Sequence, residues 1–83
     1  MTRTLINQPI DVTAVRFNNK FEPVPRRIEF QGRTLTFIGS AIRYCIQRDG
    51  HTTRMLDMSD GEAWYRLRRE GRPNTWTLVA ISR

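Results

Sequence analysis

The sequence predicts an all-β fold, namely a small antiparallel β-barrel or rolled sheet of about five to six strands, SH3-like or similar. Several short segments alternate apolar and polar residues with a period of two, and turn residues separate them. The chain has 83 residues, which is enough for one core but not for two. We therefore expect residues 9–83 to form a single β domain behind a flexible leader at residues 1–8.

The clearest local pattern is a hairpin at residues 26–37. In "RRIEFQ", Ile28 and Phe30 point to one side, and Leu35 alternates with threonines in "TLTFIG" after a tight connection at Gly32. Before this hairpin, residues 10–18 are rich in β-branched side chains and predict a strand. The segment "NNKFEPVP" between them predicts a turn or loop, because it combines two asparagines with two prolines.

Residues 40–49 fit two different structures. As a strand, the segment places Tyr44 and Ile46 on one side. As a short helix capped by Ser40, it gathers Ile42, Cys45 and Ile46 on one face. The sequence Asp49-Gly50 ends the segment under either interpretation, so the sequence leaves the choice open.

Residues 62–70 pose the same question. "SDGE" fits a hairpin turn through Asp60-Gly61 and also fits the capping box of a helix. We expect a strand, because Gly61 is a poor residue for the first turn of a helix. In addition, "WYRL" and "WTLVAI" resemble two strands that flank the loop "REGRPNT".

Charge is the most informative bulk property of the chain. Fourteen basic residues against eight acidic ones give a net charge of +6, and Lys20 is the only lysine. Such a balance favours polyanionic partners, and arginine suits both phosphate contacts and stacking on bases. The same excess of arginine over lysine also fits the codon bias of a GC-rich genome.

The stretch "EAWYRLRREGRPNTW" at residues 62–76 contains the best candidate for a nucleic-acid surface. On a strand, Trp64, Arg66 and Arg68 share one side, which combines an aromatic platform with guanidinium groups. The alternative is that Trp64 or Trp76 anchors the core and that the arginines only solvate the outer face. The candidate nucleic-acid contacts are Arg26, Arg27, Arg43, Trp64, Arg66 and Arg68.

The sequence contains no recognisable catalytic constellation. Cys45 is the only cysteine, and its apolar neighbours predict a buried thiol rather than a nucleophile paired with His51. The acidic cluster Asp57, Asp60 and Glu62 has no calcium-loop spacing, and neither a phosphate-binding loop nor a metalloprotease motif occurs. We therefore expect a non-enzymatic protein without metal or cofactor.

Nothing in the sequence predicts a contact with a membrane. No apolar run approaches the roughly 20 residues that a membrane helix needs, and the first residues lack an apolar signal core. We therefore expect a cytoplasmic protein.

The order "PIDV…VPRRIEFQGRTLTF…DGEAWYRLRREGRPNTWTLVAI" resembles an uncharacterised family of small bacterial domains. These domains occur alone or beside the error-prone DNA-polymerase-like proteins of some damage-response systems. The resemblance spans about Pro9 to Ile81, and it rests on Arg26 to Phe30, Gly32-Arg33, Trp64 to Leu67, and Trp76 to Leu78. It implies an all-β fold and a DNA-repair neighbourhood, and it supplies no catalytic residues.

Two classes of function follow from these observations. The first is a nucleic-acid-binding domain whose partner is DNA or RNA. The second is a protein-interaction or dimerisation module that uses a sheet edge or an exposed aromatic face. Salt distinguishes them, because phosphate contacts weaken steeply with ionic strength and an apolar interface does not.

Overall fold

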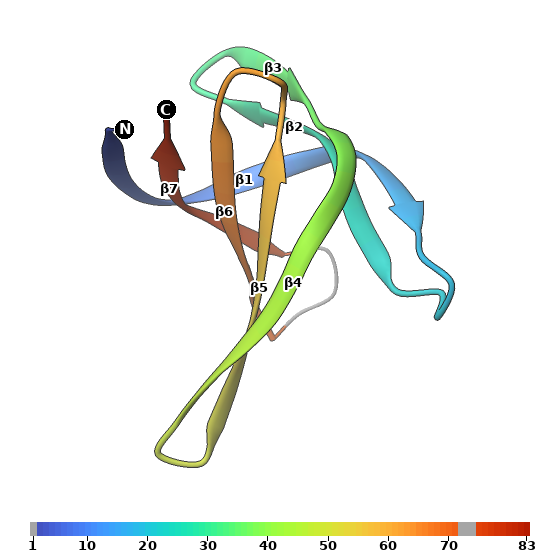
Figure 1. Cartoon of the computed structure of the whole chain (residues 1–83), viewed down its shortest axis with the longest axis vertical. Helices are drawn as coiled ribbons and strands as arrows, with labels where there is room; N and C mark the ends of the chain where they lie inside the picture. The colour runs from blue at the N-terminus through green and yellow to red at the C-terminus, as the bar shows by residue number, and fades with distance from the viewer. Residues whose placement is uncertain (1, 72–74) are drawn as a thin grey trace.

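The computed structural model describes residues 2–71 and 75–83, which form one antiparallel sheet of seven strands (Figure 1). The spatial order of the strands is β3-β2-β1-β7-β6-β5-β4. The strands are β1 (Arg3–Phe17), β2 (Pro23–Phe30), β3 (Arg33–Thr36), β4 (Ile38–Arg48), β5 (His51–Ser59), β6 (Trp64–Arg69) and β7 (Trp76–Ser82). The all-β prediction is confirmed. The described residues contain no helix, and hence none that could cross a membrane.

Both segments with two interpretations are strands. The helical alternative for residues 40–49 is wrong, because this segment lies within β4 and pairs with β5 from Ile42 to Arg48. Asp49 and Gly50 both have positive φ (52° and 79°), the backbone of the two-residue turn that joins strands tightly. The expected strand at residues 62–70 is confirmed as β6. The loop predicted at residues 69–75 includes residues 72–74, which lie outside the described residues.

The predicted hairpin at residues 26–37 is confirmed as β2 and β3, with Ile28 opposite Leu35. Gln31 and Gly32 at its turn both have positive φ (51° and 74°). The sheet is not closed into a barrel. Although β3 and β4 follow one another in the chain, they lie at opposite edges of the sheet, and within the described ranges no ladder joins them.

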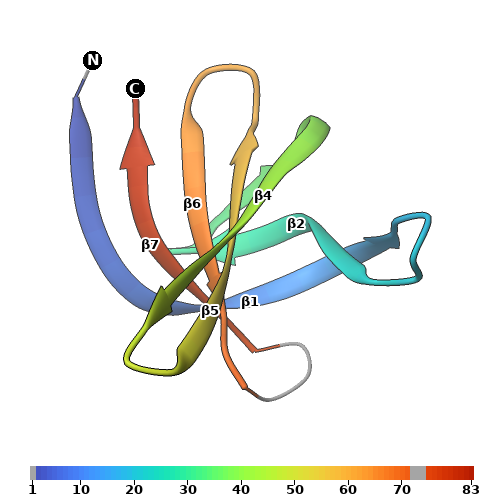
Figure 2. The same cartoon turned by 60° about the horizontal axis from the view of Figure 1, so that its bottom comes forward.

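Residues 3–8 are not a flexible leader but the first part of β1. Here Leu5 lies opposite Ala80 of β7, so the segment pairs with the last strand of the chain. This pairing cannot be seen from the position of the segment in the sequence. The register shifts between Leu5 and Gln8, where Asn7 has a φ of 52°. This irregularity bends β1, as Figure 1 and Figure 2 show, and lets one strand pair with β7 at its start and β2 at its end.

The core lies inside the curled sheet, between the β1–β3 half and the β5–β7 half. Ile28, Leu67 and Leu78 are fully buried, and the Phe37 and Tyr65 rings pack with centroids 5.5 Å apart. The buried cluster consists of Val24, Ile28, Leu35, Phe37, Leu56, Met58, Ala63, Tyr65, Leu67, Trp76 and Leu78. The expected burial of Cys45 is wrong: its side chain is exposed, on the edge strand β4.

A candidate nucleic-acid interface along the open seam

The open side of the curled sheet, between β4 and the end of the β1–β2 hairpin, is hollowed. Three adjoining hollows, of about 290, 400 and 370 Å³, share Arg16, Lys20 and Arg43 among their lining residues. We call this surface the seam groove. Its cationic residues are Arg16, Lys20, Arg26, Arg43, Arg54 and Arg69. Within the part of the chain that the structure describes, Glu22 is the only acidic residue lining it.

The turn between β1 and β2 is built around Asn18. The Asn18 side-chain oxygen accepts hydrogen bonds from the backbone N–H groups of Lys20 (2.8 Å) and Glu22 (3.0 Å). Backbone bonds from Phe21 to Asn18 (3.0 Å) and from Asn18 to Glu22 (3.2 Å) close the turn. This Asx-type arrangement fixes the direction in which residues 20–22 leave the sheet.

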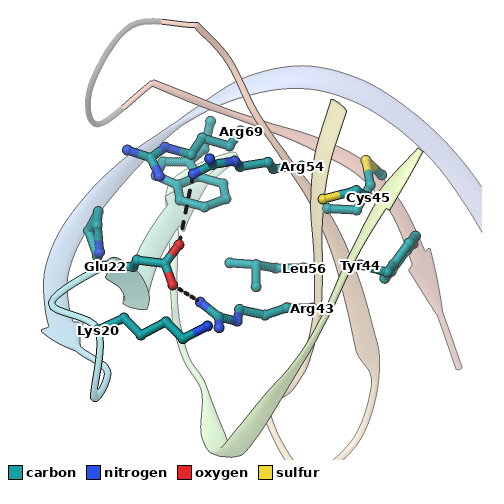
Figure 3. Close-up of a pocket in the computed structure, with 11 residues that line it drawn as sticks. Lys20, Glu22, Arg43, Tyr44, Cys45, Arg54, Leu56 and Arg69 are labelled. Carbon is teal, nitrogen blue, oxygen red and sulfur yellow. Dashed lines mark hydrogen bonds and ion pairs between the residues drawn. The ribbon is translucent and has the colours of Figure 1, made fainter. Parts of the chain in front are cut away.

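Glu22 reaches from this turn across the seam groove. Its carboxylate accepts a hydrogen bond from Arg43 (2.7 Å) and lies 3.8 Å from the Arg54 guanidinium, as Figure 3 shows. The hydrogen bonds from Arg43 and then from the Asn18 side-chain amide hold the pKa of Glu22 below its usual value. The carboxylate is therefore charged, and it ties the β1–β2 turn to β4 and β5.

Exposed aromatic rings stand beside these charges. Phe17 and Phe21, at the end of the β1–β2 hairpin, are 65% and 85% exposed. Phe21 also has a φ of 59°, a left-handed backbone conformation that is strained for a bulky residue. By contrast, Trp76 lies in the floor of the groove and is only 3% exposed, so it cannot stack on a base.

The row predicted from sequence lies on the other side of the sheet. Trp64, Arg66 and Arg68 alternate along β6 and share its outer face, and Trp64 is 42% exposed. Arg66 donates to both carboxylate oxygens of Asp57, at 3.1 and 3.4 Å, and lies 5.8 Å from the centre of the Tyr44 ring.

The neighbouring Arg68 donates to Glu70 at 2.9 Å. The Thr77 hydroxyl donates to the same Glu70 oxygen at 2.8 Å. Both arginines of the outer face are therefore already bound to carboxylates.

The acidic cluster predicted at residues 57–62 has structural partners. Asp60 accepts hydrogen bonds from the backbone of Glu62 and Ala63, both at 2.9 Å, and from the Tyr65 hydroxyl at 2.8 Å. Burial alone raises the pKa of Asp60, but these bonds outweigh it, so the pKa lies below its usual value. In residues 2–71 and 75–83, no group of three potential metal ligands is close enough to hold an ion.

The structure thus distributes the six predicted contacts over three places. Arg26 and Arg43 line the seam groove. The neighbouring Arg27 is exposed on β2, and Trp64, Arg66 and Arg68 lie on the outer face of β6. Sequence reasoning missed the groove residues Arg16, Phe17, Lys20, Glu22, Arg54 and Arg69, and the exposed Phe21 beside them. The one local signal of these residues in the sequence was "FNNKFEP". Its two phenylalanines flank a predicted turn, where few apolar neighbours are available to bury them.

Comparisons of the chain with protein-family models, with curated proteins and with solved structures find no match. The geometry and charge of the two surfaces are therefore the basis for assigning a function. Over residues 2–71 and 75–83, the seam groove has more cations without an ion pair than the outer face, together with the more exposed aromatic rings.

Proposed function

We propose that this protein is a non-enzymatic domain that binds single-stranded nucleic acid along the seam groove. The observation that carries the proposal is the combination of six cationic side chains with the exposed rings of Phe17 and Phe21. Guanidinium and ammonium groups bind the phosphate backbone and release its counterions, while aromatic rings stack on bases. We also propose that the fold is a rolled sheet, SH3-like or similar, and that the protein acts beside DNA-repair proteins.

The exposed rings favour a single strand over a duplex. In a duplex the base faces are stacked on one another and are not available to a phenylalanine side chain. A single strand can turn its bases toward Phe21 while its phosphates follow the cations along the groove. DNA and RNA share this chemistry, and the measurement below compares them.

Fluorescence anisotropy of labelled single- and double-stranded DNA and RNA, at two salt concentrations, tests the proposal. The groove variant is Lys20→Gln/Arg26→Gln, and the control is Arg33→Gln/Arg48→Gln. Both variants lose two positive charges, but Arg33 and Arg48 are exposed residues outside the groove. We expect the groove variant to bind single strands more weakly and to flatten the slope of log K against log salt by about 1.4, two phosphate contacts' worth.

The control should retain most of the affinity and most of the slope. Equal losses in the two variants would show attraction by net charge without a site. If the wild type binds no oligonucleotide even at low salt, the proposed function is wrong.

The edge of the sheet favours a second candidate function, self-association. The strand β4 has 11 residues, and among the residues that the structure describes it pairs on one side only, with β5. Exposed Ile38, Ile42 and Ile46 lie along it, which is unusual for an unprotected edge. An edge of this kind can add a strand from a second copy. Sedimentation equilibrium of the wild type and Ile42→Lys tests this, because a dimer through β4 must be insensitive to salt and weakened by the lysine.

A further inference from the structure

We infer that Glu22 occupies a phosphate site of the seam groove in the free protein and that the nucleic acid displaces it on binding. This inference rests on the proposed function and adds a regulating residue to it. Glu22 is the acidic residue of an otherwise cationic groove in the described part of the chain. Figure 3 shows its carboxylate between the ends of Arg43 and Arg54, with Lys20 and Arg69 nearby.

The two arginines form a ready site for an anion. Arg43 of β4 lies opposite Leu56 of β5, and Arg54 precedes Leu56 by two residues on β5. Both arginines therefore project from the same face of the sheet. Each carboxylate oxygen of Glu22 faces a different guanidinium, at 2.7 and 3.8 Å. A phosphate presents its oxygens to arginine in the same way. In a nucleic acid, this phosphate is a diester, so the chain continues from it in both directions.

The geometry allows Glu22 to leave without disrupting the fold. The Asn18 side-chain amide donates to the Glu22 carboxylate at 3.2 Å, and this bond is lost when Glu22 leaves. The bonds to the Asn18 side-chain oxygen and the backbone bonds that close the turn do not involve the carboxylate and remain. The Glu22, Arg43 and Arg54 side chains are 33%, 42% and 61% exposed, so a strand can reach them from solvent. An exposed ion pair of this kind is weak enough to exchange for a phosphate.

This competition lowers the apparent affinity, because only the fraction of molecules with Glu22 displaced can accept the phosphate. It also adds selectivity. A ligand without phosphates gains little by opening the site, while a phosphate replaces the carboxylate and recovers both arginine contacts. The groove therefore discriminates between a nucleic acid and other extended polymers.

The test is a double-mutant cycle on affinity for a single-stranded oligonucleotide. Glu22→Gln removes the competing charge and nearly preserves the shape of the side chain. Its control is Glu29→Gln, an exposed residue on β2 that faces Thr34 of β3 and causes the same change in net charge. We expect Glu22→Gln to tighten binding about three- to ten-fold at low salt, with Glu29→Gln changing it less than about two-fold. In an Arg43→Gln background, the gain from Glu22→Gln should disappear.

The outcomes separate this inference from the proposed function. If the wild type binds but the two glutamine variants have equal effects, or the gain persists without Arg43, Glu22 is only a structural bridge and the inference is overturned. If neither the wild type nor any variant binds at low salt, the proposed function and this inference both fail. Binding by Glu22→Gln without binding by the wild type would likewise contradict the proposed function.

A measurement on the wild type keeps the inference testable if a variant does not fold. Inorganic phosphate is titrated into the protein while the NMR signals of the Glu22 carboxyl carbon and the Arg43 and Arg54 Nε–H groups are followed. Displacement must shift the Glu22 signal together with the arginine signals. Arginine shifts with an unchanged Glu22 carboxyl signal would overturn the inference.

Discussion

The seam groove and the outer face of β6 both contain arginines and aromatic residues, but the two surfaces differ in how many of their arginines are paired with carboxylates. On the outer face, Arg66 donates to Asp57 of β5, and Arg68 donates to Glu70, which directly follows β6. In the groove, Arg43 and Arg54 share the single carboxylate of Glu22. Among the described residues, the other groove cations, Arg16, Lys20, Arg26 and Arg69, form no ion pair.

The difference shows that the number of arginines on a strand does not measure the charge available to a ligand. Antiparallel pairing places Asp57 directly opposite Arg66, so this charge is neutralised as soon as the sheet forms. The groove cations come from the β1–β2 turn and from strands on both sides of the opening. Their cross-strand neighbours are not acidic, since Arg16 lies opposite Val24, Arg43 opposite Leu56 and Arg54 opposite Arg69.

The two tryptophans give the largest expected contrast between the surfaces. Trp76 packs in the core cluster under the groove, while Trp64 is exposed on the outer face. We expect Trp76→Ala to lower the free energy of unfolding by about 3–5 kcal/mol, because it leaves a cavity in a small core. Trp64→Ala should lower it by less than about 1 kcal/mol. Urea denaturation measures both, and Trp76→Phe serves if the alanine variant does not fold.

Equal losses for the two variants would contradict this assignment of inner and outer tryptophan.

Binding gives the next contrast, between Phe21 and Trp64. If a base stacks on the exposed Phe21 ring beside the groove, Phe21→Ala should cost about 1–3 kcal/mol of binding free energy, at least about a five-fold rise in Kd. Phe21→Tyr retains the ring and should bind like the wild type. Trp64→Ala should change Kd by less than about two-fold, because its neighbouring arginines are already paired. Anisotropy titration with one single-stranded oligonucleotide measures all three variants.

The opposite ranking, with Trp64→Ala the more damaging change, would move the binding site to the outer face.

The core residue Tyr65 makes the stability of the fold depend on pH. Burial, followed by the hydrogen bond to Asp60, raises the pKa of the core residue Tyr65 to about 12. In the unfolded chain a tyrosine titrates near 10. The hydroxyl form therefore stabilises the fold below pH 10, and this contribution is lost as the pH rises from 10 to 12. We expect the free energy of unfolding to fall across this interval in the wild type and to fall less in Tyr65→Phe.

Urea denaturation at several pH values gives these free energies, and absorbance of the phenolate gives the titration itself. Titration of Tyr65 near pH 10 in the folded protein would contradict the assigned contact with Asp60.

The contrast between the two surfaces also explains how much could be predicted from the sequence. The β2–β3 hairpin was predictable, because alternation around Ile28 and Leu35 and the turn at Gly32 are local features. The shared face of Trp64, Arg66 and Arg68 was predictable for the same reason, since alternate residues of a strand share a face in any sheet. The Asp57 partner of Arg66 was not predictable, because the strand register decides it. By contrast, Glu70 lies only two residues after its partner Arg68 in the chain.

The seam groove could not be predicted, because it depends on contacts between distant parts of the chain. Residues 3–8 look like a leader until β7 supplies the partner strand, and the bend at Asn7 has no reliable signal in the sequence. The contact of Glu22 with Arg43, which follows it by 21 residues, is likewise formed only in the folded sheet. The ambiguity at residues 40–49 had a similar origin, since pairing with β5 and not local propensity makes β4 a strand.

The smallest expected effect is that of the outer-face arginines themselves. We expect Arg66→Gln/Arg68→Gln to change the affinity for a single strand by less than about two-fold, because each lost charge was already paired with a carboxylate. These side chains are more than a third exposed, so the loss of stability should stay at about 0–1 kcal/mol per pair. The same anisotropy titration, beside the groove variant Lys20→Gln/Arg26→Gln, decides between the surfaces. A strong loss of binding here would mean that a phosphate can displace Asp57 and Glu70, and the outer face of β6 would then be the interface.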